Sequence, residues 1–253
     1  LSLIDGVESL QLARFPFNGV SLNAVVGEAY GQIRGTNYVF DDLGNKVISE
    51  GGSYLETQDV ENLGSILPDF NMGIRNSISY KNFRLSALID IQQGGKFRSL
   101  TNIWGNYSGI LEQTARGNIR EEGVVLSGVT GDVTFNDDGS YTVTNTATNT
   151  TVISAQQEGQ DHFFGNDNQN VFDADYVKLR ELNLTYTFNK EWFGGFVQDV
   201  QLSAFGRNLA VWGLDNENFD PEIATGGSGN VQGSEGGSLP STLSYGLNLQ
   251  LKF

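Results

Sequence analysis

The 253-residue chain carries 15 basic and 30 acidic residues, and its formal net charge of -15 argues against any general nucleic-acid surface. It contains no cysteine, which excludes disulfides, thiolate metal sites and cysteine nucleophiles together. Hydrophobic residues make up only 38% of the chain, and no run of roughly 18 apolar residues occurs. A bundle of transmembrane helices is therefore excluded, and the acidic surplus suits long solvated loops.

The composition favours an all-β protein. There are 32 glycines, 9 tyrosines and 16 phenylalanines but 4 prolines, which indicates many strands and turns and little helix. The length suits one large all-β domain or two small ones. Because the chain starts at Leu1 without a methionine or a targeting segment, we interpret it as part of a longer protein.

The first 70 residues predict short elements. Residues 1–12 hold the end of one strand and a turn, and residues 20–38 carry short apolar pieces interrupted by glycine. A short hairpin is expected with its turn at residues 41–45, and residues 49–70 are predicted to be mostly loop.

A cleaner antiparallel hairpin is predicted over residues 72–91, with its tight turn at Lys81–Asn82. Alternate positions are apolar on one face and polar on the other, so this hairpin has one oily face. The oily face carries Met72, Ile74, Ile78, Tyr80, Phe83, Leu85, Ala87, Ile89 and Ile91. Arg84 and Asp90 lie on the polar face.

The alternation fades between residues 94 and 174. Such a long irregular segment is more natural as an external loop of a membrane barrel than inside a compact soluble domain. A small hairpin is expected within it at residues 133–144. The segment also holds His162, the only histidine, for which loop structure or ligand contact is favoured over catalysis. Three roles are possible for the aromatic residues Trp104, Tyr107, Phe163 and Phe164. They could stack on sugars, contact a partner protein or pack within the loop.

Alternation returns at residue 176. The oily face continues through Leu182 to Phe188, and Glu181 and Asn183 are on the other face. By the same alternation, Lys178 and Arg180 extend the oily face to where lipid headgroup phosphates would lie.

A turn at residues 189–199 leads into another alternating strand, on which Arg207 is expected to pair with a carboxylate. A glycine-rich loop at residues 212–240 follows. Its segment Asp215–Asp220 lacks the glycine and the glutamate of an EF-hand, so an acidic turn is favoured and a calcium site of another kind is the alternative. Asp220-Pro221-Glu222 is interpreted as a loop anchor.

The last eleven residues alternate strictly. Apolar residues alternate with polar or small residues from Leu243 to Phe253, which predicts a strand with two different faces. About 9–11 residues is the length that crosses a bilayer as a tilted strand, and aromatic residues at both ends of the apolar face suit the interfaces of a membrane barrel. If the chain ends in the periplasm, the long loops lie outside and the short turns inside, as in outer-membrane barrels.

An ordered set of motifs spans nearly the whole chain. Its members are Gly27-Glu28 with Gly31 and Gly35, Leu63-Gly64, Pro68-Asp69-Phe70, Tyr80-Lys81-Asn82-Phe83 with Gly94-Gly95, the run from Asp175 to Leu182, Gly206-Arg207-Asn208-Leu209 with Trp212, Asp220-Pro221-Glu222, and Tyr245-Gly246-Leu247 running to Phe253. This set resembles the C-terminal part of the barrel of SusC-like TonB-dependent transporters of Bacteroidetes.

The resemblance implies a fold and a location. The fold is the C-terminal segment of an antiparallel transmembrane β-barrel of about 22 strands, with roughly six to eight strands in residues 1–253. Long extracellular loops fall at about 94–174 and 212–240, and the plug and the TonB box lie outside this chain. The expected location is the outer membrane of a Gram-negative bacterium.

The resemblance also implies a function without a chemical step. The expected activity is TonB-driven import of oligosaccharides or other large nutrients, peptides among them, together with a SusD-like surface lipoprotein. The other expected partners are TonB through the missing N-terminal part, the barrel assembly machinery and outer-membrane lipids, but not nucleic acid. No enzyme activity, catalytic residue, metal site or cofactor is expected, with calcium in an external loop as the one alternative, and the substrate-binding residues are unknown.

Two groups of residues are assigned roles in this hypothesis. The C-terminal strand recognised in barrel assembly carries Tyr245, Leu247, Leu249, Leu251 and Phe253. The candidate lumen-facing residues are Arg84, Asp90, Glu181, Asn183, Arg207, Asn248 and Gln250.

Two alternatives remain open. The first is a SusC-like barrel that acts as a scaffold in an envelope complex and imports nothing. The second is a soluble or surface-anchored glycan-binding β-sandwich, in which the oily faces of the strands would be covered.

Overall fold

The computed structural model describes residues 5–17, 19–194, 196–222, 232–237 and 239–253. The chain divides into two compact units. The first unit comprises residues 1–67, 95–173 and 222–238, and the second comprises residues 68–94, 174–221 and 239–253. The predicted strand end at residues 1–4 and part of the predicted loop at 212–240 lie outside the described residues.

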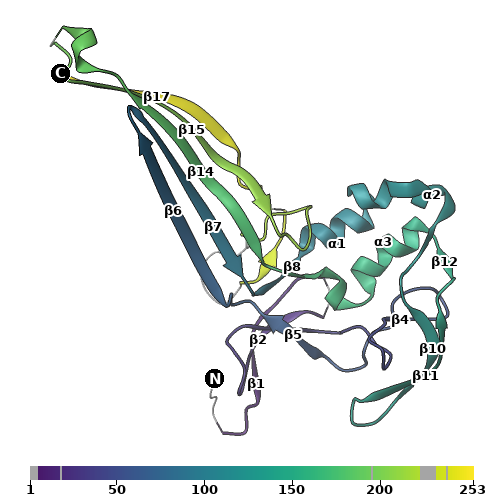
Figure 1. Ribbon diagram of the computed structural model, residues 1–253. Coiled ribbons are helices and arrows are strands. Elements are labelled where there is room, and N and C mark those ends of the chain that lie inside the picture. Colours follow the sequence, from purple (N-terminus) through teal and green to yellow (C-terminus); the bar gives the residue numbers. More distant parts are fainter. Residues whose placement is uncertain (1–4, 18, 195, 223–231, 238) are drawn as a thin grey trace. The chain divides into compact units, whose positions relative to one another are not determined.

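The second unit is one antiparallel sheet of five long strands in the order β17-β15-β14-β7-β6 (Figure 1). The strands are β6 (Phe70–Tyr80), β7 (Phe83–Gln93), β14 (Tyr176–Thr187), β15 (Asp199–Trp212) and β17 (Ser244–Lys252). A short 3-10 helix, η3 (Lys190–Phe193), lies in the turn between β14 and β15. The predicted strands at 72–91, 176–188 and the C-terminus are therefore confirmed.

The tight turn predicted at Lys81–Asn82 is also confirmed. Lys81 adopts a left-handed backbone conformation with φ of 52°. The side-chain amide of Asn82 donates a hydrogen bond to the carbonyl oxygen of Thr187 at 2.8 Å. This bond ties the β6–β7 hairpin to β14 at the end where both connections are short.

The described residues of the first unit form four small sheets. The first sheet is antiparallel in the order β1 (Ser9–Arg14), β2 (Ser21–Val25), β3 (Gln32–Gly35) and β5 (Glu61–Ser65). The others are β11 (Tyr141–Thr148), β10 (Val129–Phe135) and β4 (Val47–Ile48); β12 (Val152–Ile153) with β9 (Val124–Val125); and β13 (Val171–Asp173), β8 (Lys96–Ser99) and β16 (Ser234–Glu235). The small hairpin predicted at 133–144 is β10–β11.

The expectation of roughly six to eight barrel strands is wrong for the described residues. Only five strands belong to the long sheet. The strands of residues 9–65 are two to six residues long, too short for the about 9–11 residues that a crossing strand needs. They bury a core of their own, made by Phe15, Val20, Leu22, Ile33, Leu63 and Val171.

The segment 94–174 is folded, which corrects the prediction of an irregular loop with little helix. It holds α1 (Leu100–Tyr107), α2 (Ile119–Glu122), α3 (Ala155–Phe164), η1 (Glu112–Asn118) and η2 (Asp167–Asn170). Ser99 and Ser154 cap α1 and α3 by accepting hydrogen bonds from backbone N–H groups three residues later. The two helices lie side by side in Figure 1. No helix in the described parts of the chain has the length and apolar character needed to cross a membrane.

Close packing of α1 on α3 depends on Gly159. A Cβ atom at this position would lie 2.6 Å from the carbonyl oxygen of Asn106. We expect Gly159→Ala to cost about 1–2 kcal/mol, although alanine favours helix, because the two backbones must separate. Thermal unfolding and the rate of proteolytic cleavage within residues 95–173 of the full-length protein measure this effect.

Gly51→Ala is the matched control, because its nearest contact is Ser49 Oγ at an ordinary 3.7 Å. Equal stability of the two variants would contradict the tight contact between the helices.

Candidate functional site

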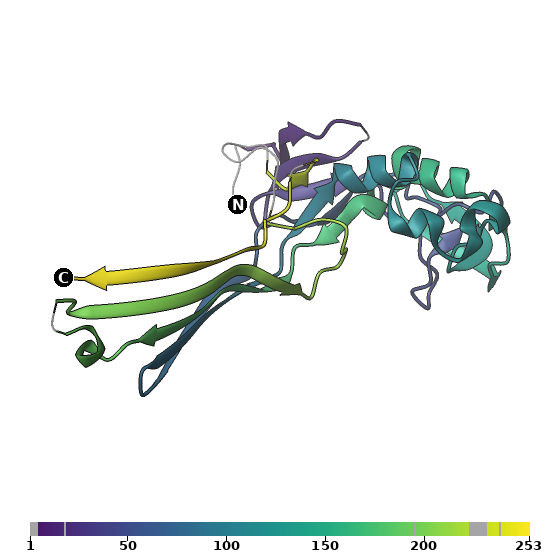
Figure 2. The same ribbon diagram turned by 90° about the horizontal axis from the view of Figure 1, so that it is seen from above.

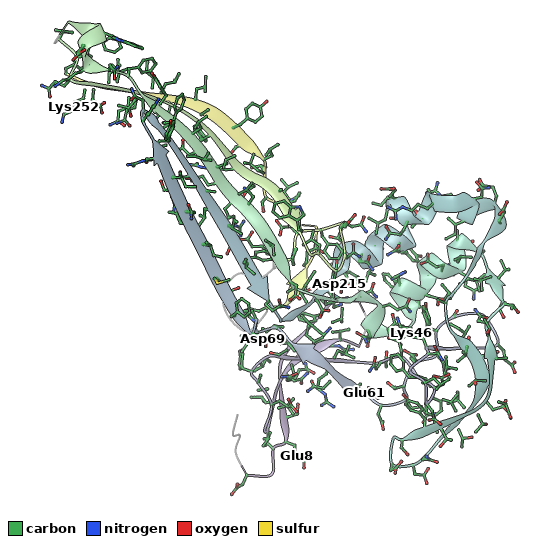
Figure 3. All side chains as sticks on the ribbon, viewed as in Figure 1. Glu8, Lys46, Glu61, Asp69, Asp215 and Lys252 are labelled. Atoms are coloured by element: carbon green, nitrogen blue, oxygen red, sulfur yellow. The ribbon has the colours of Figure 1, made fainter. Side chains whose placement is uncertain are left out.

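The five-stranded sheet has one apolar face that is open to its surroundings. Along each strand, alternate side chains point to opposite sides (Figure 3). The exposed apolar side chains are Met72, Ile74, Ile78, Tyr80, Phe83, Leu85, Leu182, Leu184, Leu202, Tyr245, Leu247, Leu249 and Leu251. Leu247 is 74% exposed. Soluble proteins rarely expose such a continuous apolar surface, and the β-sandwich alternative, which requires these faces to be covered, is not supported.

Aromatic side chains lie at both ends of this sheet. At the end with the short turns, the ring centroids of Phe83 and Tyr186 are 4.7 Å apart and those of Tyr186 and Phe188 are 4.8 Å apart. Phe70 and Trp212 are exposed at the opposite end. An apolar band with aromatic residues at both ends is typical of strands that cross a bilayer.

The C-terminal strand β17 forms one edge of the sheet, and it is the yellow arrow in Figure 2. Leu247, Leu249 and Leu251 pair with Ala204, Leu202 and Val200 of β15. Among the described residues β17 pairs with β15 alone. The alternation predicted for this strand is confirmed, and its recognition during barrel assembly stays a prediction.

The opposite face of the sheet is polar, and the register places all seven candidate lumen residues on it. Ser86 and Asn183 pair, as do Arg84 and Thr185. The remaining pairs that define this face are Lys178 with Asp90, Glu181 with Arg207, Ser203 with Asn248, and Gln201 with Gln250. That this face lines a lumen stays a prediction.

A β-bulge at Arg180 changes which residues share a face. The pairing of β14 with both neighbours shifts between Leu179 and Glu181. Relative to β7, β14 has one extra residue here, whereas β15 has one extra residue relative to β14. Positions of β14 above and below the bulge therefore alternate in opposite phase. Lys178 therefore lies on the polar face opposite Asp90, and the prediction that it extends the oily face is wrong.

Arg180 also has a different role from the predicted one. Its Nε and Nη2 donate hydrogen bonds to Oδ2 of Asp90 at 2.8 and 2.6 Å. The two side chains are mostly buried, with 16% and 28% of their surfaces exposed. The guanidinium is thus engaged by a carboxylate of the neighbouring strand and not directed to lipid headgroups.

Arg207 pairs with a carboxylate, as the sequence predicts. Its Nε lies 3.8 Å from Oε2 of Glu181, and Nη1 of Arg75 lies 3.8 Å from Oε1 of the same residue. Both arginine side chains are at least 60% exposed. Such exposed pairs contribute about 0–1 kcal/mol each, so they arrange charge on the polar face more than they stabilise it.

Lys178 and Asp220 form the most buried ion pair of the sheet unit. Lys178 Nζ lies 2.5 Å from Oδ1 of Asp220, and Oγ of Ser241 donates a hydrogen bond to Oδ2 of Asp220 at 2.5 Å. The segment 213–221, here called the strap, is thereby fixed to β14. The prediction that Asp220 anchors a loop is confirmed, and its partner is the lysine that the bulge redirects.

A cavity of about 340 Å³ lies under the strap. Its apolar walls come from Leu209, Ala210, Val211, Leu214, Phe219 and Pro240. The polar lining is Lys178, Asn208, Glu217, Asn218, Asp220 and Ser241. The sequence predicts an acidic turn here but not the cavity, because the wall is assembled from β15, the strap and the approach to β17.

His162 belongs to a polar network in the first unit. Its Nδ1 lies 3.2 Å from Oδ1 of Asn170, and its Nε2 lies 3.3 Å from Oε1 of Glu158. Asn102 of α1 donates to the same Asn170 oxygen at 3.0 Å. The network joins α1, α3 and η2, which agrees with the structural role favoured for His162 over catalysis.

The four loop aromatic residues pack on one another. Trp104 contacts Tyr107 and Phe163 with ring centroids 5.9 and 5.0 Å apart, and Phe163 lies 4.7 Å from Phe164. The interplanar angles of the two Trp104 contacts are 88° and 67°, so these rings meet edge to face and form no flat platform. Packing within the segment is confirmed, and contact with sugars or a partner stays a prediction.

The described residues contain no group of three or more histidine or acidic side chains placed to hold a metal ion. Calcium binding by an external loop stays a prediction.

Most of the negative charge lies in the first unit. It carries 21 acidic and 7 basic residues, whereas the sheet unit carries 9 and 8. The sheet unit is thus close to neutral, and the acidic surplus belongs to the unit that includes segment 94–174. This distribution fits the solvated loops expected from the composition.

Comparisons with known proteins point to one kind of protein. No family model matches the chain. The chain is 24% identical over 210 residues to TonB-dependent receptor P3 of Formosa agariphila, covering 81% of this chain and 18% of that protein. It is 27% identical over 206 residues to TonB-dependent receptor P26 of the same organism, covering 79% and 18%. The chain therefore spans about a fifth of the length of these relatives, neither of which is named as an enzyme.

The fold resembles solved structures of the RagAB peptide importer. The closed-closed state matches 99% of this chain and 25% of that chain with a TM-score of 0.60 and 18% sequence identity. A second structure of the RagAB peptide transporter matches with a TM-score of 0.59 at the same identity. These likenesses concern the fold alone, and they confirm the all-β fold that the sequence predicts.

The buried ion pair generates a stability prediction. Asp220→Ala leaves the buried ammonium of Lys178 unpaired, which we expect to cost about 3–5 kcal/mol. The double variant Lys178→Met with Asp220→Leu should recover most of this loss, because no buried charge remains. A double-mutant cycle on thermal unfolding of the full-length protein, with proteolysis of the strap as a local readout, measures the coupling.

Arg75→Ala is the control for this cycle, because it removes a partner from an exposed pair and should change stability by less than about 1 kcal/mol. A cost for Asp220→Ala as small as that of the control would show that the pair does not hold the strap.

Asp161 generates a prediction about pH. Burial raises the pKa of this carboxyl group, and a hydrogen bond from Ser53 opposes the shift. Its Oδ2 is buried without a hydrogen-bond partner in the described part of the chain. A raised folded pKa means that stability is lost as the pH rises through it. Asp161→Asn should therefore stabilise the protein at neutral pH, and its advantage should shrink as the pH falls through the raised pKa of Asp161 toward the ordinary aspartate value of about 4.

Asp138→Asn is the control of opposite sign, because hydrogen bonds from Ser140 lower the pKa of Asp138. This variant should be destabilised at neutral pH and should approach the parent as the pH falls. Thermal unfolding between about pH 2 and pH 8, a range that includes the ordinary aspartate pKa, compares both variants. An advantage of Asp161→Asn that does not depend on pH would contradict the effect of burial.

Proposed function

We propose that this chain, a segment of a SusC-like TonB-dependent transporter, forms part of the wall through which large nutrients are imported across the outer membrane of a Gram-negative bacterium. The observation that carries the proposal is the sheet with two different faces. Its apolar face with aromatic ends suits lipid, and its hydrogen-bonded polar face suits a solvated interior.

The architecture suits a wall and not a centre of chemistry. The groups on the polar face are held by one another, as in the pairs of Arg180 with Asp90 and of Lys178 with Asp220. A wall of fixed, paired charges keeps its shape while other parts of a transporter move past it. The edge strands β6 and β17 each pair with one neighbour in the described residues, and in the membrane their free edges need further strands, because unpaired backbone groups cost several kcal/mol each in lipid.

The proposed substrates are large nutrients, with peptides or oligosaccharides as the two classes. The fold neighbours are peptide importers by name, which favours peptides. The proposed partners are a SusD-like surface lipoprotein and, through the rest of the protein, TonB. The resemblance of the sequence motifs supports both partners.

Substitutions on the two faces of one strand test the proposal. Leu249→Arg places a charge on the apolar face of β17, where we expect a cost of about 2–4 kcal/mol if the face meets the middle of the bilayer. Asn248→Arg, one residue away, places the same charge on the polar face and should be tolerated. The measurement is the heat-modifiable band of the full-length protein in the outer-membrane fraction of its native host.

Loss of that band for Leu249→Arg with retention for Asn248→Arg is the expected result. Equal behaviour of both variants, or recovery of the parent protein in the soluble fraction, would contradict the assignment of the sheet to the membrane. Uptake of a nutrient peptide by a strain with the parent protein and by a deletion strain then separates import from a scaffold role.

A further inference from the structure

We propose that the cavity under the strap is a binding site for a side chain that joins an aliphatic stem to a positively charged end, such as a lysine side chain of an imported peptide. The inference rests on the proposed import function and adds a substrate preference to it.

The size and the walls of the cavity suit one long side chain. Its volume of about 340 Å³ is at the lower end of the range for small-ligand pockets. Leu209, Val211 and Leu214 contribute apolar walls. Methylene groups are stabilised against such walls, whereas the edge of a sugar ring needs several polar partners.

The charged residues of the lining determine which sign of charge a ligand in the cavity should carry. The ammonium of Lys178 is neutralised by Oδ1 of Asp220. Oδ2 of Asp220 accepts a hydrogen bond from the hydroxyl group of Ser241. The amide of Asn208 donates to the carbonyl oxygen of Thr242 at 3.0 Å. Glu217 is exposed, and its carboxylate has no hydrogen bond or ion pair with another residue of the described part of the chain. Glu217 therefore contributes a negative charge without a counter-charge among the described residues, here called the open charge of the lining.

The cavity is formed before any ligand binds. The Lys178–Asp220 pair fixes the end of the strap, and Phe219 beside it is buried. Within the strap, Oδ1 of Asn216 accepts hydrogen bonds from the backbone N–H and the side-chain amide of Asn218, both at 2.9 Å. A site with fixed walls loses little entropy on binding.

The position of the cavity connects it with transport. Lys178 lies on the polar face of β14, opposite Asp90, and the strap covers this lysine. A ligand in the cavity therefore lies beside the face proposed to line the path of the solute. The short turn that contains η3 is at the other end of β14 and β15.

Two peptides that differ in one charge test the proposal. Both are alanine octapeptides with blocked ends, one with a central lysine and one with norleucine, which keeps the aliphatic stem without the charge. Titration calorimetry with the full-length transporter, purified from its host with its partner protein, gives both affinities. We expect the parent to prefer the lysine peptide by about two- to fivefold, the range for a partly exposed ion pair.

Glu217→Gln should remove this preference and leave the affinity for the norleucine peptide unchanged, since glutamine keeps the shape of the side chain. Glu191→Gln, at the opposite end of the strands, is the matched control and should keep the preference. Leu214→Trp fills the cavity and should weaken binding of both peptides about tenfold or more. The heat-modifiable band checks that each variant is folded.

A preference for lysine that survives in Glu217→Gln, or equal binding of the two peptides by the parent, would overturn the proposed site. Failure of the parent to bind either peptide would also overturn it. The import function is scored separately by uptake in the parent and deletion strains, so either proposal can fail without the other.

Discussion

The hydrogen bonds that β14 makes to β7 on one side and to β15 on the other decide which side chains of the sheet lie together. They hold an antiparallel register over ten residue pairs with each neighbour. Because side chains alternate across a strand, this register sorts the oily positions from the polar ones. The shift at Arg180 is the one place in β14 where the alternation is broken. The two most buried ion pairs of the sheet unit, Arg180 with Asp90 and Lys178 with Asp220, lie beside it.

The bulge connects local backbone geometry to the architecture around it. An extra residue in β14 turns Lys178 toward the polar face, where its ammonium needs a counter-charge once it is buried. Asp220 supplies that charge from a segment more than forty positions along the chain, and the strap closes over the lysine as a result. Both the cavity and the proposed ligand preference follow from this single pairing, because it leaves Glu217 as the open charge of the lining.

The two units divide the physical tasks of the chain. The sheet unit is nearly neutral and exposes an apolar face, which suits contact with lipid. The first unit carries most of the acidic residues, buries its own small core around Leu22 and Ile33, and joins its helices through a polar network at His162. Repulsion among like charges keeps such a unit solvated and disfavours contact with anionic surfaces.

The long strands, the short turn at Lys81–Asn82 and the two faces of the sheet can be predicted from the sequence, because period-two alternation and turn chemistry are local properties. The polar side of Glu181, Asn183 and Asn248 follows from the same alternation, and the motifs at Asp175–Leu182 and Gly206–Leu209 carry a resemblance to SusC-like transporters. The folding of segment 94–174 with residues 1–67 into a unit that contains helices becomes visible in the three-dimensional structure alone. Its stability comes from contacts between distant segments, such as the pairing of β10 with β4, which no local pattern reveals. The same holds for Lys178: alternation alone places it on the oily face, and only the pairing of β14 with two neighbours shows the bulge that moves it to the other side.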